Sequence, residues 1–551
     1  MFPACSGVIQ RGDACESSSA GALAREGRRE NSMFRPVGRP AVAGLLAVAL
    51  AGTFPGAGAA GAADPDPIRD WPRTEVAPGV TLYQGETRGR PGADFWTATV
   101  RFAAADGPQH LAGEADAQAL AGKLRAGGFE PRVERVDWPA GVDAAPGAVG
   151  WRVRTGSFGG RDEAAALERS LDEAGFDALV EWTGADAAPG TGIARTSVVI
   201  LDPNAFRGEL AAGYGTAVAG REKLTEMSAR RDALFGVNAG FFVMEDKDGI
   251  PGASAGIAAY DGELQSAATN GRIALVLRGD GMRPQLAKLS TEITASARGQ
   301  QRLVDGVNRV PGKIRNCGGV DGDTPTERPQ HDVTCTDPDE LVLFTDELGA
   351  PTPTGDGVEA VRDRTGRVLE VRPAGGPVPA GGTVVQGLGQ AAEWLVAHAR
   401  AGEPLWVDQQ IREESGAPLR LGPSDDIVNG GPELVRDGQV RINLQEDGII
   451  HDAPSFAYTW GLKRNPRSVI GVDAQGRVIL ATTEGRMPGF SDGWGLPEAA
   501  EFVRALGAVD AMALDGGGSA GMVVDDRVVT TPSDATGERA IGDALFLLPR
   551  R

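Results

Sequence analysis

The sequence predicts an α+β protein in which a large, mixed and hairpin-rich domain follows a small βαββαβ domain. Three observations predict this class. The 551 residues, 41% of them hydrophobic, are enough to bury at least two substantial cores. Residues 95–182 pass twice through the order strand, helix, strand. The later residues combine several hairpin turns with a few amphipathic helices, which is typical of a mixed sheet protein.

The small domain is predicted by its internal repetition. "FWTATVRFAA" (95–104) alternates as a strand, "EADAQALAGKLRAGGF" (114–129) has helical spacing and ends in glycine, and "PRVERVDW" (131–138) is again a strand. Residues 149–160, 161–178 and 179–182 repeat the same three steps. Two βαβ units in tandem form a ferredoxin-like sandwich.

The N-terminus reads as a leader. From Met33 the chain runs through "AVAGLLAVALAGTF" (41–54) to Ala60-Gly61-Ala62, the pattern of a cleaved secretory signal. The apolar run is too short for a membrane span, which needs about 20 residues, although an uncleaved anchor is the alternative. We expect residues 1–63 to be a mis-started extension plus this signal. The expected order is then a linker (64–94), the small domain (95–184), a linker (185–194) and the large domain (195–551).

Charge and cysteine content narrow the function classes. A net charge of −20 disfavours nucleic acid and anionic membrane surfaces as general partners. Cys317 and Cys335 are an even pair in an exported chain, so a disulfide is the favoured interpretation. A metal site is disfavoured because the chain has four histidines and no C-x-x-C. A calcium loop at Asp321 and Asp323 is a weaker alternative, because the remaining ligands are not at the required positions.

The stretch "MALDGGGSAGMVV" (512–524) fits two familiar motifs, and its surroundings support neither. Both a dinucleotide loop and a hydrolase nucleophile elbow require a helix after the loop, whereas "GMVVDDRVV" reads as a hairpin. The elbow also requires a later histidine, and the last one is His451. The remaining interpretation is a carboxylate, Asp515, at a strand end, followed by glycine amides that could approach a ligand oxygen.

Other polar residues stand at predicted strand ends and turns. Asn238 ends a strand in "GVNAGFF", where its alternative role is to brace neighbouring loops. Asn429 begins a tight turn, and Arg467 precedes a strand whose hairpin turns at Asp473. The return strand ends at Glu484-Gly485-Arg486.

Two resemblances follow from these motifs. The strand and helix of the second repeat resemble a SPOR domain at Gly156, Ser157, Phe158, Ala164, Leu171, Gly175 and Phe176. This resemblance implies binding of peptidoglycan glycan strands on the face of the sheet. A packing module without glycan affinity is the alternative. The ordered set "GVNAGFF", "NGGPELVRDG", "RNPRSVIGVD", "TTEGR", "LDGGGSAGMV" and "PSDATGER" resembles the phosphodiester glycosidase family, that of N-acetylglucosamine-1-phosphodiester alpha-N-acetylglucosaminidase. The chain departs from this pattern in an insertion that carries Cys317 and Cys335, and in the loop 489–495.

The second resemblance implies a hydrolase that cleaves the bond between an anomeric carbon and a phosphate. The phosphate monoester is a good leaving group, so the site needs a carboxylate and cations more than a strong general acid. The candidate catalytic residues are Asp515, Glu484 and Asp473, although Asp473 could simply shape its hairpin turn. The candidate substrate-binding residues are Asn238, Asn429, Arg467, Arg486, Gly516, Gly517, Gly518, Ser519 and Arg539. Guanidinium groups suit phosphate oxygens, although each arginine could instead form a salt bridge within this acidic protein.

Three functions remain open at this point. The first is a secreted or wall-associated hydrolase of sugar-1-phosphodiesters that needs no cofactor, acts on wall glycopolymers and is held on peptidoglycan by the SPOR-like domain. The second is a phosphodiesterase that cleaves the P–O bond, a chemistry that usually relies on metals. The third is a cell-wall binding protein with a silent catalytic fold.

Overall fold

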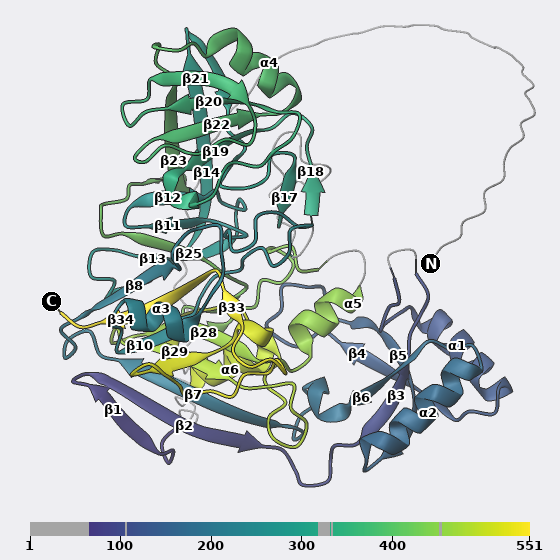
Figure 1. Cartoon of the computed structure of the whole chain (residues 1–551). Coiled ribbons are helices and arrows are strands. Elements are labelled where there is room, and N and C mark those ends of the chain that lie inside the picture. Colours follow the sequence, from purple (N-terminus) through teal and green to yellow (C-terminus); the bar gives the residue numbers. More distant parts are fainter. Residues whose placement is uncertain (1–65, 105–106, 318–330, 332–333, 451–453, 551) are drawn as a thin grey trace, which may run out of the picture. The chain divides into compact units, whose positions relative to one another are not determined.

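The computed structural model describes residues 66–104, 107–317, 331, 334–450 and 454–550 (Figure 1). It confirms the α+β class with a strand-rich architecture. The predicted leader, the candidate calcium loop and His451 lie outside the described residues. Within the described ranges, every helix is too short or too polar to cross a membrane.

The small domain has the predicted βαββαβ order. Its elements are β3 (Trp96–Val100), α1 (Glu114–Ala126), β4 (Pro131–Asp137), β5 (Ala148–Phe158), α2 (Arg161–Glu173) and β6 (Ala178–Trp182). The strands form an antiparallel sheet in the order β4-β5-β3-β6. Both helices pack on one face of this sheet, where Leu124, Val153 and Leu171 are fully buried (Figure 1). The opposite face carries no helix of this domain.

An eight-stranded antiparallel sheet, called the main sheet here, forms the centre of the large domain. Its strands, in spatial order, are β1 (Arg73–Ala77), β2 (Val80–Arg88), β7 (Ile193–Leu201), β29 (Val478–Thr483), β28 (Arg467–Asp473), β30 (Ala508–Ala513), β26 (Glu433–Arg436) and β27 (Gln439–Val440). Every neighbouring pair in it is antiparallel.

The main sheet corrects the two predicted linkers. Residues 64–94 include β1 and β2, and β2 pairs with β7 along its whole length, from Val80 opposite Leu201 to Arg88 opposite Ile193. Val80 and Leu82 are buried in the core, so this segment is held by apolar packing as well as by its backbone hydrogen bonds. The second segment, 185–194, ends inside β7 and follows a short 3-10 turn, η1 (Thr183–Asp186).

The remaining strands form three further sheets and two short pairs. One sheet joins β32 (Arg527–Val528), β31 (Met522–Val524), β10 (Phe235–Asn238), β34 (Asp543–Leu548) and β8 (Glu209–Tyr214). A second joins β12 (Glu263–Ser266), β11 (Ala258–Tyr260), β25 (Asp426–Asn429), β13 (Ile273–Leu277), β14 (Gln285–Ala297), β23 (Trp406–Glu413) and β24 (Pro418–Leu419), with β15 (Gln300–Leu303) beside β14. A third joins β16 (Gly306–Val307), β19 (Leu341–Thr345), β22 (Thr383–Gly387), β20 (Val358–Arg362) and β21 (Val368–Pro373). The short pairs are β17 (Lys313–Arg315) with β18 (Thr334–Thr336), and β33 (Ala540–Ile541) with β9 (Glu222–Lys223).

Short helices and turns complete the large domain. They are α3 (Leu224–Arg230), η2 (Asp346–Leu348), α4 (Gly389–His398), α5 (Pro454–Phe456), η3 (Ala457–Leu462), α6 (Leu496–Ala505) and η4 (Gly517–Ser519). The predicted disulfide is present between Cys317 and Cys335 and adjoins the β17–β18 pair.

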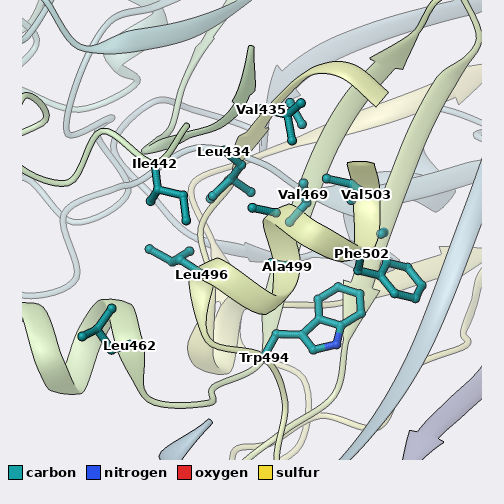
Figure 2. Close-up of a cluster of buried hydrophobic side chains, with 14 of the residues drawn as sticks. Leu434, Val435, Ile442, Leu462, Val469, Trp494, Leu496, Ala499, Phe502 and Val503 are labelled. Atoms are coloured by element: carbon teal, nitrogen blue, oxygen red, sulfur yellow. The ribbon is translucent and has the colours of Figure 1, made fainter. Parts of the chain in front are cut away.

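Apolar packing on both faces holds the main sheet in place. On one face, Leu496, Ala499 and Val503 of α6 pack in a cluster with Leu434 and Val469 (Figure 2). On the other face, Ile470, Leu480 and Met512 pack in a cluster with side chains of β10 and β34. Burial on both faces fixes the strand register. The start of β28 and the ends of β30 and β10 are therefore rigid, and they hold the polar residues located there in fixed positions.

Candidate active site

A cavity of about 570 Å³ lies where β28 begins and β30 ends. Six of the predicted site residues line it, namely Asp515, Gly516, Gly517, Arg467, Arg486 and Arg539. These six include one carboxylate and three guanidinium groups, and Asp492, Arg464 and Lys463 line the same cavity. A cavity of this size with a few convergent polar groups is typical of a small-molecule site.

The position of Asp515 is set by the strands around it. Leu514 and Asp515 continue β30, and their amides donate to the carbonyls of Ser468 (2.8 Å) and Ala239 (2.8 Å). The side-chain amide of Asn238 donates to the Asp515 carbonyl at 2.7 Å. Because the backbone is held on both sides, the carboxylate has a defined place in the wall. Burial raises the pKa of Asp515 to about 6, so it is ionised at neutral pH and accepts a proton readily below it.

The glycines after Asp515 make room for arginines. Gly517 has φ +61°, and a Cβ there would lie 3.0 Å from Nη2 of Arg486. A Cβ on Gly518 would lie 2.1 Å from Nη2 of Arg539. The expected cradle of free amides is not observed at the first two glycines. The amide of Gly516 donates to the Asp515 carboxylate (2.9 Å) and that of Gly517 to the Pro466 carbonyl (2.9 Å), so both are already used within the loop.

Arg467 and Arg486 are two cations that form no salt bridge with the described residues. Arg467 is only 4% exposed, donates to the Trp494 carbonyl at 3.2 Å, and lies 5.2 Å over the Trp460 ring. Burial, reinforced by Arg486, lowers its pKa to about 9. Arg486 donates to the Asn465 side chain at 3.1 Å. Neither arginine has a carboxylate within 4 Å in the described part of the chain, which leaves their charge available to an anionic ligand.

Arg539 is tied down more firmly. Its Nε and Nη2 donate to the two oxygens of Asp534 at 2.8 and 3.0 Å, a bidentate pair that fixes the plane of the guanidinium. Arg539 still lines the cavity and stabilises the ionised form of Asp515. Arg539 is therefore a cation of the cavity and also forms a salt bridge within the protein, which was the alternative interpretation.

The two other candidate carboxylates lie outside this cavity. Glu484 accepts a hydrogen bond from the Thr531 amide at 2.9 Å, and burial raises its pKa. Asp473 accepts the amides of Gln475 (2.9 Å) and Arg477 (2.8 Å) and pairs with the Arg477 side chain (2.6 Å). It stands at the opposite end of β28 from Arg467, roughly 20 Å away at about 3.3 Å per residue. Asp473 therefore stabilises the hairpin turn, and the structure does not place it in the site.

The four remaining candidate substrate-binding residues lie next to the segments that form the cavity. Asn238 accepts from Ser468 Oγ (2.6 Å) and the Gly521 amide (3.1 Å), so it joins three strands beneath Asp515. Asn429 accepts the Phe241 amide at 2.9 Å and donates to the Phe241 carbonyl at 3.2 Å, which fixes the turn after β10. Gly518 and Ser519 line a much smaller adjoining pocket. None of these four residues lines the main cavity.

The structure adds residues that motif reasoning missed. Trp460 and Lys463 line the cavity just before the "RNPRSVIGVD" motif, and Asn465 lines it from within the motif. Their proximity to that motif is the signal that could have found them. His110 and Trp182 also line it, although they belong to the small domain. No sequence pattern indicated that the two domains share one cavity. Among the described residues, no group of three or more His, Cys, Asp or Glu side chains is arranged to hold a metal ion.

Comparison with known proteins agrees with these features. The phosphodiester glycosidase family matches residues 355–548, and the SPOR domain family matches residues 110–180. N-acetylglucosamine-1-phosphodiester alpha-N-acetylglucosaminidase of Mus musculus is 32% identical over 117 residues. That match spans 21% of this chain and 22% of the mouse protein, so only about a fifth of the mouse protein is covered.

Two crystal structures have a related fold. A Burkholderia pseudomallei protein described as exported superposes with a TM-score of 0.78 at 32% identity, over 87% of this chain and 96% of the other. A hypothetical protein from Synechocystis superposes with a TM-score of 0.50 at 16% identity, over 86% of this chain and 78% of the other, which shows a shared fold alone. Together, the family matches and the site motifs show that this chain carries a SPOR domain followed by a domain of the phosphodiester glycosidase family.

Proposed function

We propose that this protein is a hydrolase that cleaves the bond between the anomeric carbon of a sugar and the phosphate of a phosphodiester. The observation that carries the proposal is the cavity in which Asp515 faces Arg467 and Arg486, two cations without a carboxylate partner among the described residues. A phosphodiester supplies the missing negative charge. The sugar next to it supplies the anomeric carbon on which a carboxylate acts.

The chemistry divides between these residues. Guanidinium groups of Arg467 and Arg486 bind the phosphate oxygens and stabilise the charge that the leaving phosphate gains as the C–O bond breaks. The ionised Asp515 lies on the same wall, where it activates water or stabilises the oxocarbenium-like transition state. The phosphate monoester needs little protonation on departure, because its second pKa is near 6. A second carboxylate is therefore less necessary than in glycosidases that expel an alcohol.

The catalytic unit extends beyond the family match in this proposal. Residues 195–354 contribute β7 to the main sheet and β10, whose Asn238 holds the Asp515 loop. We therefore take the catalytic domain as residues 195–551, with β1 and β2 as an N-terminal addition to its sheet. The hydrogen bonds around Asp515 are complete only when both segments, 195–354 and 355–548, are present.

An extracytoplasmic location at the cell wall fits the rest of the chain. The SPOR domain implies peptidoglycan binding. The similar Burkholderia pseudomallei protein is described as exported, and a disulfide such as Cys317–Cys335 is typical of proteins outside the cytoplasm. Cell-wall glycopolymers that contain sugar-1-phosphodiesters are the substrates we propose.

Hydrolysis in ¹⁸O-labelled water tests the bond that is cleaved. The purified protein is offered a panel of sugar-1-phosphodiesters, and the label is expected on the C1 oxygen of the released sugar. Label in the phosphate would show P–O cleavage and would replace this proposal with a phosphodiesterase. Asp515→Asn is the control for the third function: activity unchanged by this substitution would indicate that Asp515 has no catalytic part.

A further inference from the structure

The helix-free face of the SPOR sheet is occupied in this protein. Its central side chains are Thr99, Arg154 and Glu181, which strand pairing places on the side opposite α1 and α2. Arg154 is 1% exposed and Glu181 is 6% exposed. A charged side chain is buried to this degree only when other groups cover and pair it.

The covering groups come from the large domain and from the turn that leads to it. Arg154 pairs with Glu181 at 2.9 Å and with Asp186 of η1 through both carboxylate oxygens, and Glu181 also pairs with Lys463. Arg152, on the same face, pairs with Asp186 at 3.0 Å and donates to the Tyr458 hydroxyl. Lys463 and Arg154 hold the pKa of Glu181 well below its usual range even though burial opposes this. The network is therefore ionised at neutral pH and joins the two domains.

This contact brings the SPOR domain into the cavity of the candidate active site. His110 and Trp182 line the same cavity as Asp515 and Arg467. Trp182 ends β6 directly after the buried Glu181, and its ring packs against Trp96 with 5.2 Å between the ring centroids. Trp460 of η3 adds a second aromatic side chain from the large domain.

The chemistry of this wall suits a sugar ring. Partly exposed indoles offer flat apolar surfaces to the C–H face of a pyranose. A nearby polar group can then form hydrogen bonds with the hydroxyls of the sugar. His110 Nδ1 lies 3.7 Å from Glu181 Oε1 and has no hydrogen-bond partner among the described residues. Burial lowers the pKa of His110, so the ring is neutral and provides one donor and one acceptor. Asp515 and the arginines line the same cavity.

We propose that the SPOR domain forms part of the active-site wall, where Trp182 and His110 bind a second sugar ring of the substrate, on the far side of the phosphate from the cleaved sugar. This inference rests on the proposed function, since it takes that cavity as the substrate site. The preferred substrates are then diesters with a sugar on both sides of the phosphate. The SPOR domain acts as a determinant of specificity there.

The test compares two substrates in matched variants. One substrate carries a sugar on each side of the phosphate, and the other carries one sugar and a methyl group. Trp182→Ala and His110→Ala are expected to raise KM for the two-sugar diester about tenfold and to leave KM for the methyl diester unchanged. Trp406→Ala and His398→Ala are the matched controls, because neither residue lines the cavity and Trp406 is 57% exposed. They should change neither KM.

Equal losses on both substrates, or no loss on either, would overturn the inference. Trp182→Phe guards against a general folding defect, and it should give an intermediate KM for the two-sugar diester alone. If the wild-type protein cleaves neither diester, the proposed function fails by itself. The inference is then decided by calorimetry with non-hydrolysable phosphonate analogues of both diesters. Weaker binding of the two-sugar analogue alone in Trp182→Ala supports it, and unchanged binding of both rejects it.

Discussion

Asp515→Asn should inactivate the protein and, at neutral pH, stabilise its free form. Burial raises the pKa of Asp515 to about 6 from its ordinary value of 3.8. The folded state therefore binds this proton more tightly than the unfolded state does. The stabilisation that results is fully present below about pH 4 and is lost as the pH rises through about 6.

The size of the effect follows from the two pKa values. The difference between 3.8 and about 6 corresponds to about 3 kcal/mol of unfolding free energy, at about 1.4 kcal/mol for each pH unit. Asparagine carries no charge at any pH, and its side-chain oxygen can still accept the Gly516 amide. The variant should therefore exceed the wild-type free energy of unfolding by up to about 3 kcal/mol at pH 7.5 and match it near pH 4. Asp543, whose pKa burial also raises to about 6, is present in both proteins and cancels in the difference.

Urea unfolding of both proteins at pH 4, 5.5 and 7.5 measures this difference. Activity should fall by about 10²- to 10⁴-fold in the variant, as expected for loss of a catalytic carboxylate. In the wild-type protein, kcat/KM should fall as the pH drops through about 6, where Asp515 of the free enzyme becomes protonated. A stability difference that is the same at pH 4 and pH 7.5, or a variant that is less stable at pH 7.5, would refute the reasoning.

Three further predictions concern the neighbouring groups. Arg467→Gln should weaken binding of inorganic phosphate about 10- to 100-fold in calorimetry, because a charge-assisted contact is lost, whereas Asp473→Asn at the distant hairpin should leave phosphate binding unchanged; similar losses in both would contradict the assigned site. Glu484→Gln should keep kcat within about threefold, since Glu484 lies outside the cavity and the glutamine oxygen can still accept the Thr531 amide; inactivation would return Glu484 to the catalytic residues. Replacing Cys317 and Cys335 together by serine should lower the free energy of unfolding by about 3 kcal/mol, as expected for a loop of 18 residues, and reductant should then no longer affect the melting temperature; an unchanged stability would show that this crosslink adds nothing.

Local patterns in the sequence were sufficient for much of this structure. The twice-repeated strand, helix and strand predicted the small domain to within a few residues, because alternation and helical spacing are set by near neighbours along the chain. The hairpin after the glycine loop excluded both familiar motifs for the same reason, and η4 is indeed followed by β31 rather than by a helix. Asp515, Arg467 and Arg486 were chosen at predicted strand ends, and Arg539 came from the "PSDATGER" motif of the family resemblance; all four line the cavity.

Tertiary structure alone decided which of the predicted residues meet. Asp473 and Arg467 belong to one strand, yet only the beginning of β28 reaches the cavity. The linker became β2 because its partner, β7, lies more than 100 residues later, across the whole small domain. His110 and Trp182 of the small domain line the same cavity, and no local pattern specifies this or the Glu181–Lys463 ion pair that joins the two domains. Near-neighbour chemistry thus determined the elements and the reactive groups, while the packing of distant surfaces determined the partners of each group.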